Sequence, residues 1–324
     1  MQEKDFISQY EKDKPMYELW GHIIQDYICT QLKTKKIEPL ALFKIYPIVP
    51  RLKLTNSLVY KAFYHPNKKY SDPYTEITDK VGIRFVVLTV DDINIVKDII
   101  ESNNEWKFSK DRDFEEEKLQ KPELFEYQSV HYIVRNKVAI QDGNITILQN
   151  TPCEVQIRTL LQHAYAELSH DIIYKSKEKI LPKMKRDFAK SMALIETTDG
   201  VFKEVKKMVD RYNKPFDDYI EMTLPYTYSD YYTPNINKYI YDEINDFLQQ
   251  KNIKLDNIKE YIINNKSLQN IVKNNNDLLL RNQPISYLIY YIVDKYQYSA
   301  KDYLPLAEYE LEPFFIDLGK NINY

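Results

Sequence analysis

Glycine is scarce in this chain, and that scarcity limits the nucleotide-binding folds that the chain can adopt. Only five glycines occur among 324 residues, at positions 21, 82, 143, 200 and 319, and no two of them lie close together. The Walker-type P-loop and the G-x-G-x-x-G turn of dinucleotide-binding folds both hold phosphates with clustered glycine backbone. Both are therefore excluded, and any phosphate bound here must be held by side chains.

Composition and charge indicate a folded cytoplasmic protein without a membrane segment. The chain is 44% hydrophobic, enough for a sizeable core, and its net charge of −3 means that any nucleic-acid contact must be local. Cys29 and Cys153 are far apart and form no disulfide framework, which favours a reducing compartment. Residues 1–15 are charged throughout, and no apolar run approaches the roughly 18 residues of a membrane span.

The order of hydrophobic patterns predicts an α+β fold with a mixed β-sheet. Strand-like runs occupy residues 81–88, 129–134, 145–149 and 153–158. An Asp142-Gly143 turn lies between the second and third runs, and residues 92–102 have the spacing of a helix. This order is typical of a mixed sheet with helices packed on it, rather than of a doubly wound fold.

Helical patterns and a change of composition predict two regions. Helices are expected at residues 1–38, 56–63, 159–177 and 183–212. Near Asn213 the composition changes, and TLPYTYSDYYTPN has the character of a linker. We therefore expect a catalytic region, residues 1–212, with its motifs at 40–212. A mainly helical region for regulation or interaction, residues 213–324, follows it.

A polar strand face and a polar helix stripe follow one another in the sequence. The strand period of two places Glu154, Gln156 and Arg158 on one face of CEVQIR. A solvated edge strand would show the same pattern, so the spacing alone leaves both interpretations open.

The helix after this strand carries its own polar stripe. His163, Glu167, His170 and Tyr174 recur at steps of four, three and four residues. His163, Glu167 and His170 could converge on zinc, but the H-E-x-x-H pattern is absent, and structural hydrogen bonding is the simpler interpretation.

Two charged side chains lie just before the first predicted strand and within it. Asp79 precedes this strand and Arg84 lies within it. A carboxylate at the mouth of a strand suits hydrated Mg²⁺, and Glu154 could supply a second carboxylate. Taken singly, Asp79 could be a turn cap and Arg84 a surface charge.

Further candidate ligands of a nucleotide lie upstream and downstream of this strand. Across the start of a short helix lie Arg51, Lys53, Ser57 and Lys61. A glycine-poor protein would need such cations to bind triphosphate, although an ordinary solvated basic face would contain the same residues. Tyr127 could stack on a base, and His131 could contact a phosphate on the strand that follows.

Five motifs in order carry a resemblance to a known family. They are R-x-K-x-x-x-S-x-x-x-K (51–61), D-x-V-G-I-R (79–84), E-Y-Q-S-V-H-Y (126–132), E-V-Q-I-R-T (154–159) and H-A-Y-A-E-L-S-H-D-x-x-Y-K (163–175). Together they resemble the RelA/SpoT alarmone synthetase domain over roughly residues 40–212. The resemblance implies a nucleotidyltransferase-like α+β fold. It also implies transfer of the β,γ-pyrophosphate of ATP to a 3′-hydroxyl, with release of AMP.

The resemblance also assigns roles on the ATP side. It implies that Arg51 and Arg84 sandwich the adenine, that Lys53, Ser57 and Lys61 face the ATP phosphates, and that Asp79 and Glu154 hold Mg²⁺. Positioning and charge neutralisation dominate phosphoryl-type transfer, and these groups supply both.

On the acceptor side the resemblance implies that Tyr127 stacks on the acceptor base. It places His131, Gln156, Arg158 and His163 near the acceptor phosphates or the transition state, and Glu154 where it can accept the hydroxyl proton. Two departures affect this side. The glycine that usually precedes the stacking tyrosine is Glu126, and the usual aromatic residue of the helix motif is Tyr165 rather than Trp.

Short members of this family suggest a growth-inhibiting toxin with one of two acceptors. No hydrolase motifs precede the synthetase motifs, so we expect synthesis without degradation. The acceptor would be a purine nucleotide (GDP, GTP or an adenine nucleotide) or the 3′ CCA end of tRNA. A catalytically silent nucleotide sensor is the third hypothesis. The candidate partners are an antitoxin, a phage protein that triggers anti-phage defence, or a second copy in a homo-oligomer.

Overall fold

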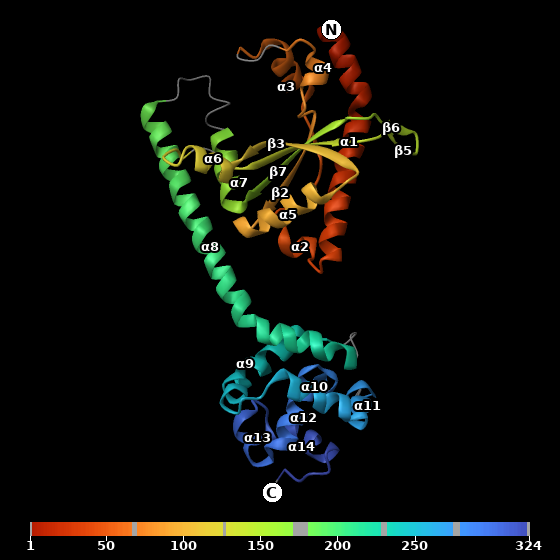
Figure 1. The fold of residues 1–324 in the computed structure, drawn as a ribbon, viewed down its shortest axis with the longest axis vertical. Helices are drawn as coiled ribbons and strands as arrows, with labels where there is room; N and C mark the ends of the chain where they lie inside the picture. Colours follow the sequence, from red (N-terminus) through yellow and green to blue (C-terminus); the bar gives the residue numbers. More distant parts are fainter. Residues whose placement is uncertain are drawn as a thin grey trace. The chain divides into compact units, whose positions relative to one another are not determined.

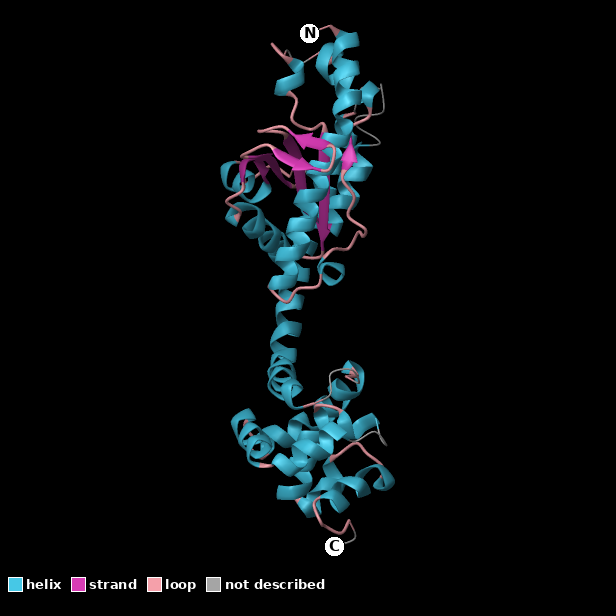
Figure 2. Ribbon diagram, turned by 90° about the vertical axis from the view of Figure 1, so that its right-hand side faces the viewer, coloured by secondary structure: helices cyan, strands magenta, loops and turns pink. Residues whose placement is uncertain are grey.

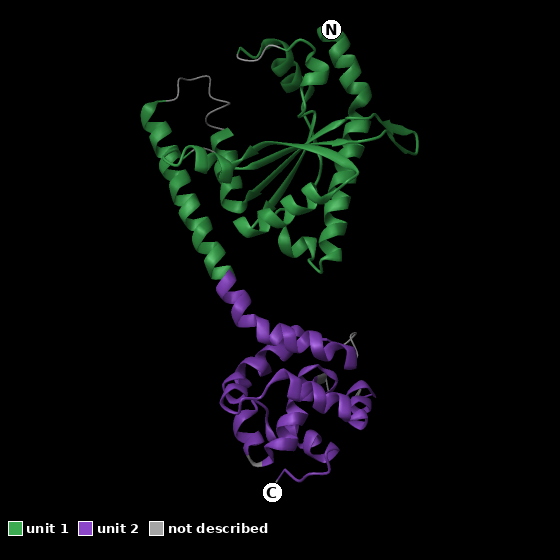
Figure 3. Ribbon diagram, viewed as in Figure 1, with its two compact units in different colours: residues 1–206 green, residues 207–324 purple. Residues whose placement is uncertain are grey.

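The chain consists of two compact units. The computed structural model describes residues 2–66, 70–125, 128–170, 181–227, 232–274 and 279–322. Unit 1 comprises residues 1–206 and unit 2 residues 207–324 (Figure 3). In the part of the chain so described, no helix combines the length and the apolar character needed to cross a membrane.

Unit 1 contains every described strand, and unit 2 is helical (Figures 1 and 2). The strands are β1 (Arg51–Leu52), β2 (Val81–Val87), β3 (Trp106–Asp113), β4 (Val130–Asn136), β5 (Ile140–Asp142), β6 (Ile145–Ile147) and β7 (Pro152–Thr159). The helices up to the division are α1 (Glu3–Thr34), α2 (Pro39–Leu42), α3 (Thr55–Val59), α4 (Pro73–Glu76), α5 (Val90–Ser102), α6 (Phe114–Gln120), α7 (Leu160–Ser169) and α8 (Pro182–Thr223).

A mixed five-stranded sheet is the centre of unit 1. Its order is β1-β2-β7-β4-β3, in which only β2 and β7 are parallel neighbours. Alternation separates the two faces cleanly, because successive side chains of a strand point to opposite sides. The apolar face consists of Ile83, Phe85 and Val87 on β2, Val130, Tyr132 and Val134 on β4, and Cys153, Val155 and Ile157 on β7.

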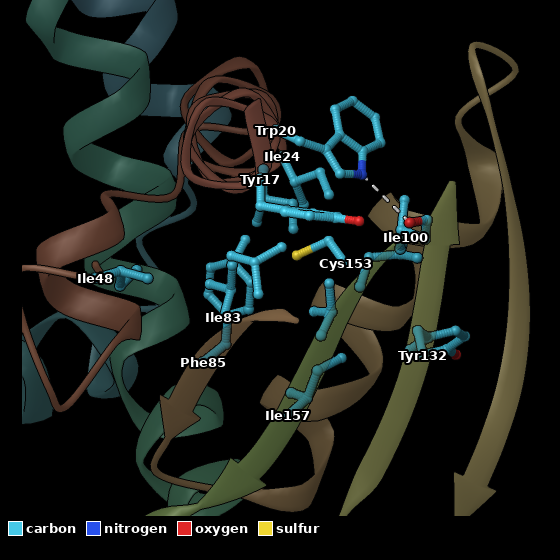
Figure 4. Packing of buried hydrophobic residues seen from close by; sticks show 14 of the residues in the cluster. Tyr17, Trp20, Ile24, Ile48, Ile83, Phe85, Ile100, Tyr132, Cys153 and Ile157 are labelled. Carbon is cyan, nitrogen blue, oxygen red and sulfur yellow. Dashed lines mark hydrogen bonds between the residues drawn. The ribbon is translucent and has the colours of Figure 1, made fainter. Parts of the chain in front are cut away.

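Helices α1 and α5 cover this apolar face. Side chains of Tyr17, Trp20 and Ile24 on α1 gather against the strands (Figure 4). On α5 a capping box closes the first turn, because the Thr89 side chain accepts from the third backbone N–H and Asp92 returns the hydrogen bond. The opposite face of the sheet is polar, and α7 and α8 lie on that side.

Unit 2 has its own core. Its helices after the division are α9 (Pro234–Gln250), α10 (Leu255–Asn264), α11 (Lys266–Asn274), α12 (Ile285–Lys295), α13 (Gln297–Tyr303) and α14 (Glu308–Asp317). Helix α12, ISYLIYYIVDK, is apolar on nearly all sides and accordingly buried along most of its length.

The predicted α+β class is confirmed, and several element predictions need correction. Residues 145–149 do not join the main sheet, because β5 and β6 form a separate hairpin at the Asp142-Gly143 turn. Helix α8 continues to Thr223 rather than ending at residue 212, and the units divide at residue 206, inside that helix. Phe216 and Tyr219 on its last turns are buried in the core of unit 2, which favours helix despite Pro215. Strand β3 and helix α6 were not predicted at all.

Candidate active site

The polar face of β7 carries a connected row of side chains. Gln156 Nε2 donates to Glu154 Oε2 at 3.0 Å, and the Arg158 guanidinium donates to Gln156 Oε1. His131 on β4 places Nδ1 3.2 Å from Glu154 Oε1. The solvated-edge interpretation of this strand is therefore wrong, since β7 lies between β2 and β4 in the sheet.

Strand register brings three predicted site residues into one line. Arg84 on β2 is paired with Gln156 on β7, and Gln156 is paired with His131 on β4. Paired positions in neighbouring strands lie about 5 Å apart on the same face. His131 lies 47 positions after Arg84 and 25 positions before Gln156, so the sheet brings together residues that are far apart in the sequence. The sequence alone does not reveal this pairing.

Asp79 lies immediately before β2 and is clamped by two lysines. Its Oδ2 is 2.8 Å from Lys53 Nζ and 2.7 Å from Lys61 Nζ. Lys53 follows β1, and Lys61 lies on a π-helical turn, Tyr60–Tyr64, that continues α3. Burial alone would raise the pKa of Asp79, but the two ammonium groups outweigh it and the pKa is lowered. The carboxylate is therefore ionised at neutral pH.

Glu154 is likewise an ionised carboxylate. Burial would raise its pKa, and the nearby charge of Asp79 acts in the same direction. The hydrogen bond from His131 prevails, so the pKa of Glu154 is lowered.

The two carboxylates fit a magnesium ion that arrives with a nucleotide. Asp79 Oδ1 is buried and has no hydrogen-bond partner among the described residues, so one oxygen of this carboxylate still has lone pairs for a ligand. No cluster of three or more His, Cys, Asp or Glu side chains that could hold a metal occurs in the described ranges. Mg²⁺ commonly binds one or two carboxylates and completes its shell with substrate phosphates and water.

Helix α7 brings a histidine and a glutamate to the same site. Thr159 caps this helix, and Gln162 completes the capping box. Glu167 Oε1 accepts from Arg84 at 2.7 Å and lies 3.8 Å from His163 Nδ1. Burial, with Arg84 and Arg158 nearby, lowers the pKa of His163, so its imidazole is neutral at pH 7.

Most of these groups line one cavity of about 1810 Å³ in unit 1. Pockets for a single small ligand usually measure about 300–1,000 Å³, so this cavity has room for two nucleotides. The predicted site residues on its wall are Arg51, Lys53, Ser57, Asp79, Arg84, His131, Glu154, Gln156, Arg158 and His163. Lys61 is not on the wall and reaches the site through Asp79. Tyr127, Glu126, Tyr174 and Lys175 lie outside the described residues.

The sequence prediction missed part of the cavity wall. Arg112 on β3 and Lys185, Arg186 and Lys190 on α8 add positive charge to it. The strand WKFSKDRD shows no apolar alternation because most of it is exposed. The α8 cations were not singled out, because cations on an amphipathic helix usually form a solvated face.

Comparison with known protein families gives a match to the segment that contains this site. Residues 50–179 match the family described as "Region found in RelA / SpoT proteins". The match begins one residue before Arg51 and contains all the predicted site residues, and it is shorter than the expected 40–212.

Two relatives from Bacillus subtilis (strain 168) are similar to this chain. GTP pyrophosphokinase YjbM is 26% identical over 172 residues, which cover 52% of this chain and 75% of YjbM. GTP pyrophosphokinase YwaC is 23% identical over 157 residues, which cover 48% of this chain and 70% of YwaC.

Among solved structures, the chain is similar to small alarmone synthetase 1 from B. subtilis bound to its product pppGpp. The TM-score is 0.49 at 22% identity, covering 63% of this chain and 99% of that one. For the same synthetase bound to AMPCPP the TM-score is 0.48 at 21% identity, covering 63% and 99%.

Proposed function

We propose that this chain is an ATP-dependent pyrophosphokinase that uses a purine nucleotide as acceptor, with a guanine nucleotide as the first choice. The observation that carries the proposal is the pair of ionised carboxylates, Asp79 and Glu154, set among cations in one large cavity. Two relatives that are similar to about half of this chain are named GTP pyrophosphokinase, which supports the choice of guanine.

The reaction divides into two sides of the cavity. In the transfer, the 3′-oxygen of the acceptor bonds to the β-phosphorus of ATP, the bond between that phosphorus and the α,β-bridging oxygen breaks, and AMP leaves. Glu154 is the proposed acceptor of the hydroxyl proton, because it is ionised and lies in the row of His131 and Gln156. Lys53 and Lys61 are proposed to bind the phosphates of ATP.

Asp79 and Glu154 are the proposed holders of Mg²⁺. Bound there with ATP, the ion would neutralise charge on the phosphates. Arg84 and Arg158, on neighbouring strands, are placed to neutralise the charge that remains in the transition state.

The decisive experiment asks which acceptor becomes labelled by γ-labelled ATP. GDP, GTP, AMP, ADP and bulk tRNA are supplied separately with Mg²⁺, and we expect label on GDP or GTP. Glu154→Gln should reduce transfer at least about 100-fold, since it removes a general base. Glu105→Gln is the matched control, because Glu105 is exposed on the same unit and should retain activity.

Other outcomes decide between the remaining hypotheses. Label on tRNA alone would replace the nucleotide acceptor with the tRNA 3′ end, and label on no acceptor would reject the enzyme. Growth arrest on expression of wild type, lost with Glu154→Gln, would support a toxin. Normal growth with full transferase activity would reject that role.

A second test concerns the clamp on Asp79. Asp79→Asn frees Lys53 and Lys61 from their carboxylate partner. We therefore expect it to bind AMPCPP about tenfold more tightly than wild type in EDTA, by calorimetry. With Mg²⁺ present the order should reverse, because the carboxylate is then needed. The same order in both buffers would contradict the assigned roles.

A further inference from the structure

Helix α8 is hydrogen-bonded to the sheet through two acidic side chains one turn apart. Thr159 Oγ1, at the end of β7, donates to Asp199 Oδ2 at 2.8 Å. Gln128 Nε2, just before β4, donates to Glu196 Oε2 at 2.7 Å. Thr159, Gln128 and Asp199 are all buried, with Asp199 only 2% exposed.

A fifth side chain joins these two contacts. Gln162 in the first turn of α7 accepts from the Thr159 backbone N–H at 3.0 Å, and its own N–H donates to Thr159 Oγ1 at 3.1 Å. Its Nε2 donates to Gln128 Oε1 at 3.5 Å. The Thr159 hydroxyl thus donates once, to Asp199, and accepts from α7, which fixes its proton.

Each anchor of this network is close in sequence to a side chain of the active site. Thr159 follows Arg158, and Gln162 precedes His163. Gln128 lies two residues before the start of β4, the strand that carries His131. The network therefore fixes residues that lie one to three positions from Arg158, His163 and His131, and these three are the residues proposed for the acceptor side.

Fold stability alone does not account for Asp199. Its Oδ1 is buried without a hydrogen-bond partner among the described residues. Burial also raises the pKa of Asp199 to about 6, so at neutral pH the protein contains a poorly solvated carboxylate. A neutral side chain could fill this position with less loss of solvation. What the carboxylate provides is a strong, fixed acceptor for one hydroxyl.

We propose that Asp199 and Glu196 are positioning residues, which fix the positions of side chains on the acceptor side of the active site through hydrogen bonds to neighbouring residues. Neither side chain is among those that line the cavity. They act through Thr159 and Gln128, which fix where Arg158 and His131 stand. This inference rests on the proposed function, because the acceptor is the ligand whose binding it concerns.

The test compares the two substrates of the reaction. Asp199→Ala and Glu196→Ala should each raise the KM for GDP about tenfold, the effect of losing one hydrogen bond to a charged group. The KM for ATP should stay within about twofold of wild type. Asp199→Asn retains an acceptor for the Thr159 hydroxyl and should restore most of the lost affinity.

Glu204→Ala is the matched control on α8. Glu204 is exposed and is not among the residues that line the cavity, so both KM values should remain those of wild type. Equal increases in both KM values, or no increase in either, would overturn the positioning role.

Amide exchange separates this inference from the proposed function. Residues 156–165 should exchange faster in Asp199→Ala than in wild type or Glu204→Ala, whether or not any transfer is detected. Unchanged exchange would overturn the inference even in an active enzyme. If Asp199→Ala does not fold, the same comparison is made with Glu196→Ala, whose side chain is 34% exposed and better tolerates truncation.

Discussion

Replacing Asp199 by Asn should stabilise unit 1 at neutral pH, and the size of the effect follows from one pKa. The carboxyl has a pKa of 3.8 when solvated and about 6 in the folded protein, where burial disfavours its charge. Between these values the folded chain binds more protons than the unfolded chain. Stability is therefore lost as pH rises through this interval, and the loss is complete above about pH 6.

The pH dependence isolates this charge from other consequences of the substitution. With these two pKa values, ionisation of Asp199 destabilises the fold by about 1 kcal/mol at pH 4.5 and about 3 kcal/mol at pH 7.5. Asn lacks this ionisation, and its hydrogen bonds contribute equally at both pH values. The stability of Asp199→Asn relative to wild type should therefore increase by about 2 kcal/mol from pH 4.5 to pH 7.5.

Urea unfolding followed by tryptophan fluorescence measures this difference in the full chain. Trp20 and Trp106 are the only tryptophans, and both are buried in the core of unit 1, so the signal reports that unit. A difference that is equal at the two pH values, or that decreases toward pH 7.5, would refute the argument from burial.

Three further changes test the packing around the site, and the same fluorescence assay measures each. Gly21→Ala places a Cβ 2.5 Å from Pro50 Cβ, next to β1, and should cost about 3 kcal/mol because the proline ring cannot move aside; a cost below about 1 kcal/mol would contradict this. Thr89→Ala removes the cap of α5 and should cost about 1 kcal/mol, whereas Thr89→Ser should be nearly neutral. Lys97→Met removes the ammonium group 2.7 Å from the buried Asp113 carboxylate and should cost about 2 kcal/mol at pH 7, with a smaller cost at pH 3 as the carboxyl becomes protonated.

The sequence predicted those strands that pack one face against the apolar core and turn the other face to a polar site. Strands β2, β4 and β7 have one face against α1 and α5 and one against the site, so their residues alternate and the strands were identified. Strand β3 is an exposed edge, where nothing selects for alternation. The end of α8 was misplaced because the composition changes near Asn213, whereas buried aromatic residues beyond that point, Phe216 and Tyr219, keep the chain helical.

The candidate site shows a similar division. Motif spacing identified Asp79, Arg84 and Glu154 individually, since each lies in a short segment with its own pattern. It could not show which groups pair, because the pairs join segments far apart in sequence: Lys53 with Asp79, and Arg84 with Glu167. Asp199 was missed for the same reason, since its partner on β7 lies 40 residues away.

The pairings of the ligand-free site explain how so many cations can be kept in one cavity. Lys53 and Lys61 both contact Asp79, and Arg84 contacts Glu167, so each has a carboxylate partner before any phosphate arrives. These pairs are partly exposed, the lysine side chains by 28% and 21%, and pairs in such surroundings contribute little net stability. Exchanging a carboxylate for a phosphate therefore costs little, while cations left unpaired at this depth would destabilise the fold. In the proposed reaction, the carboxylate that neutralises the lysines at rest would become available to the metal once the triphosphate pairs with them, so one exchange of partners would prepare both the proposed nucleotide site and the proposed metal site.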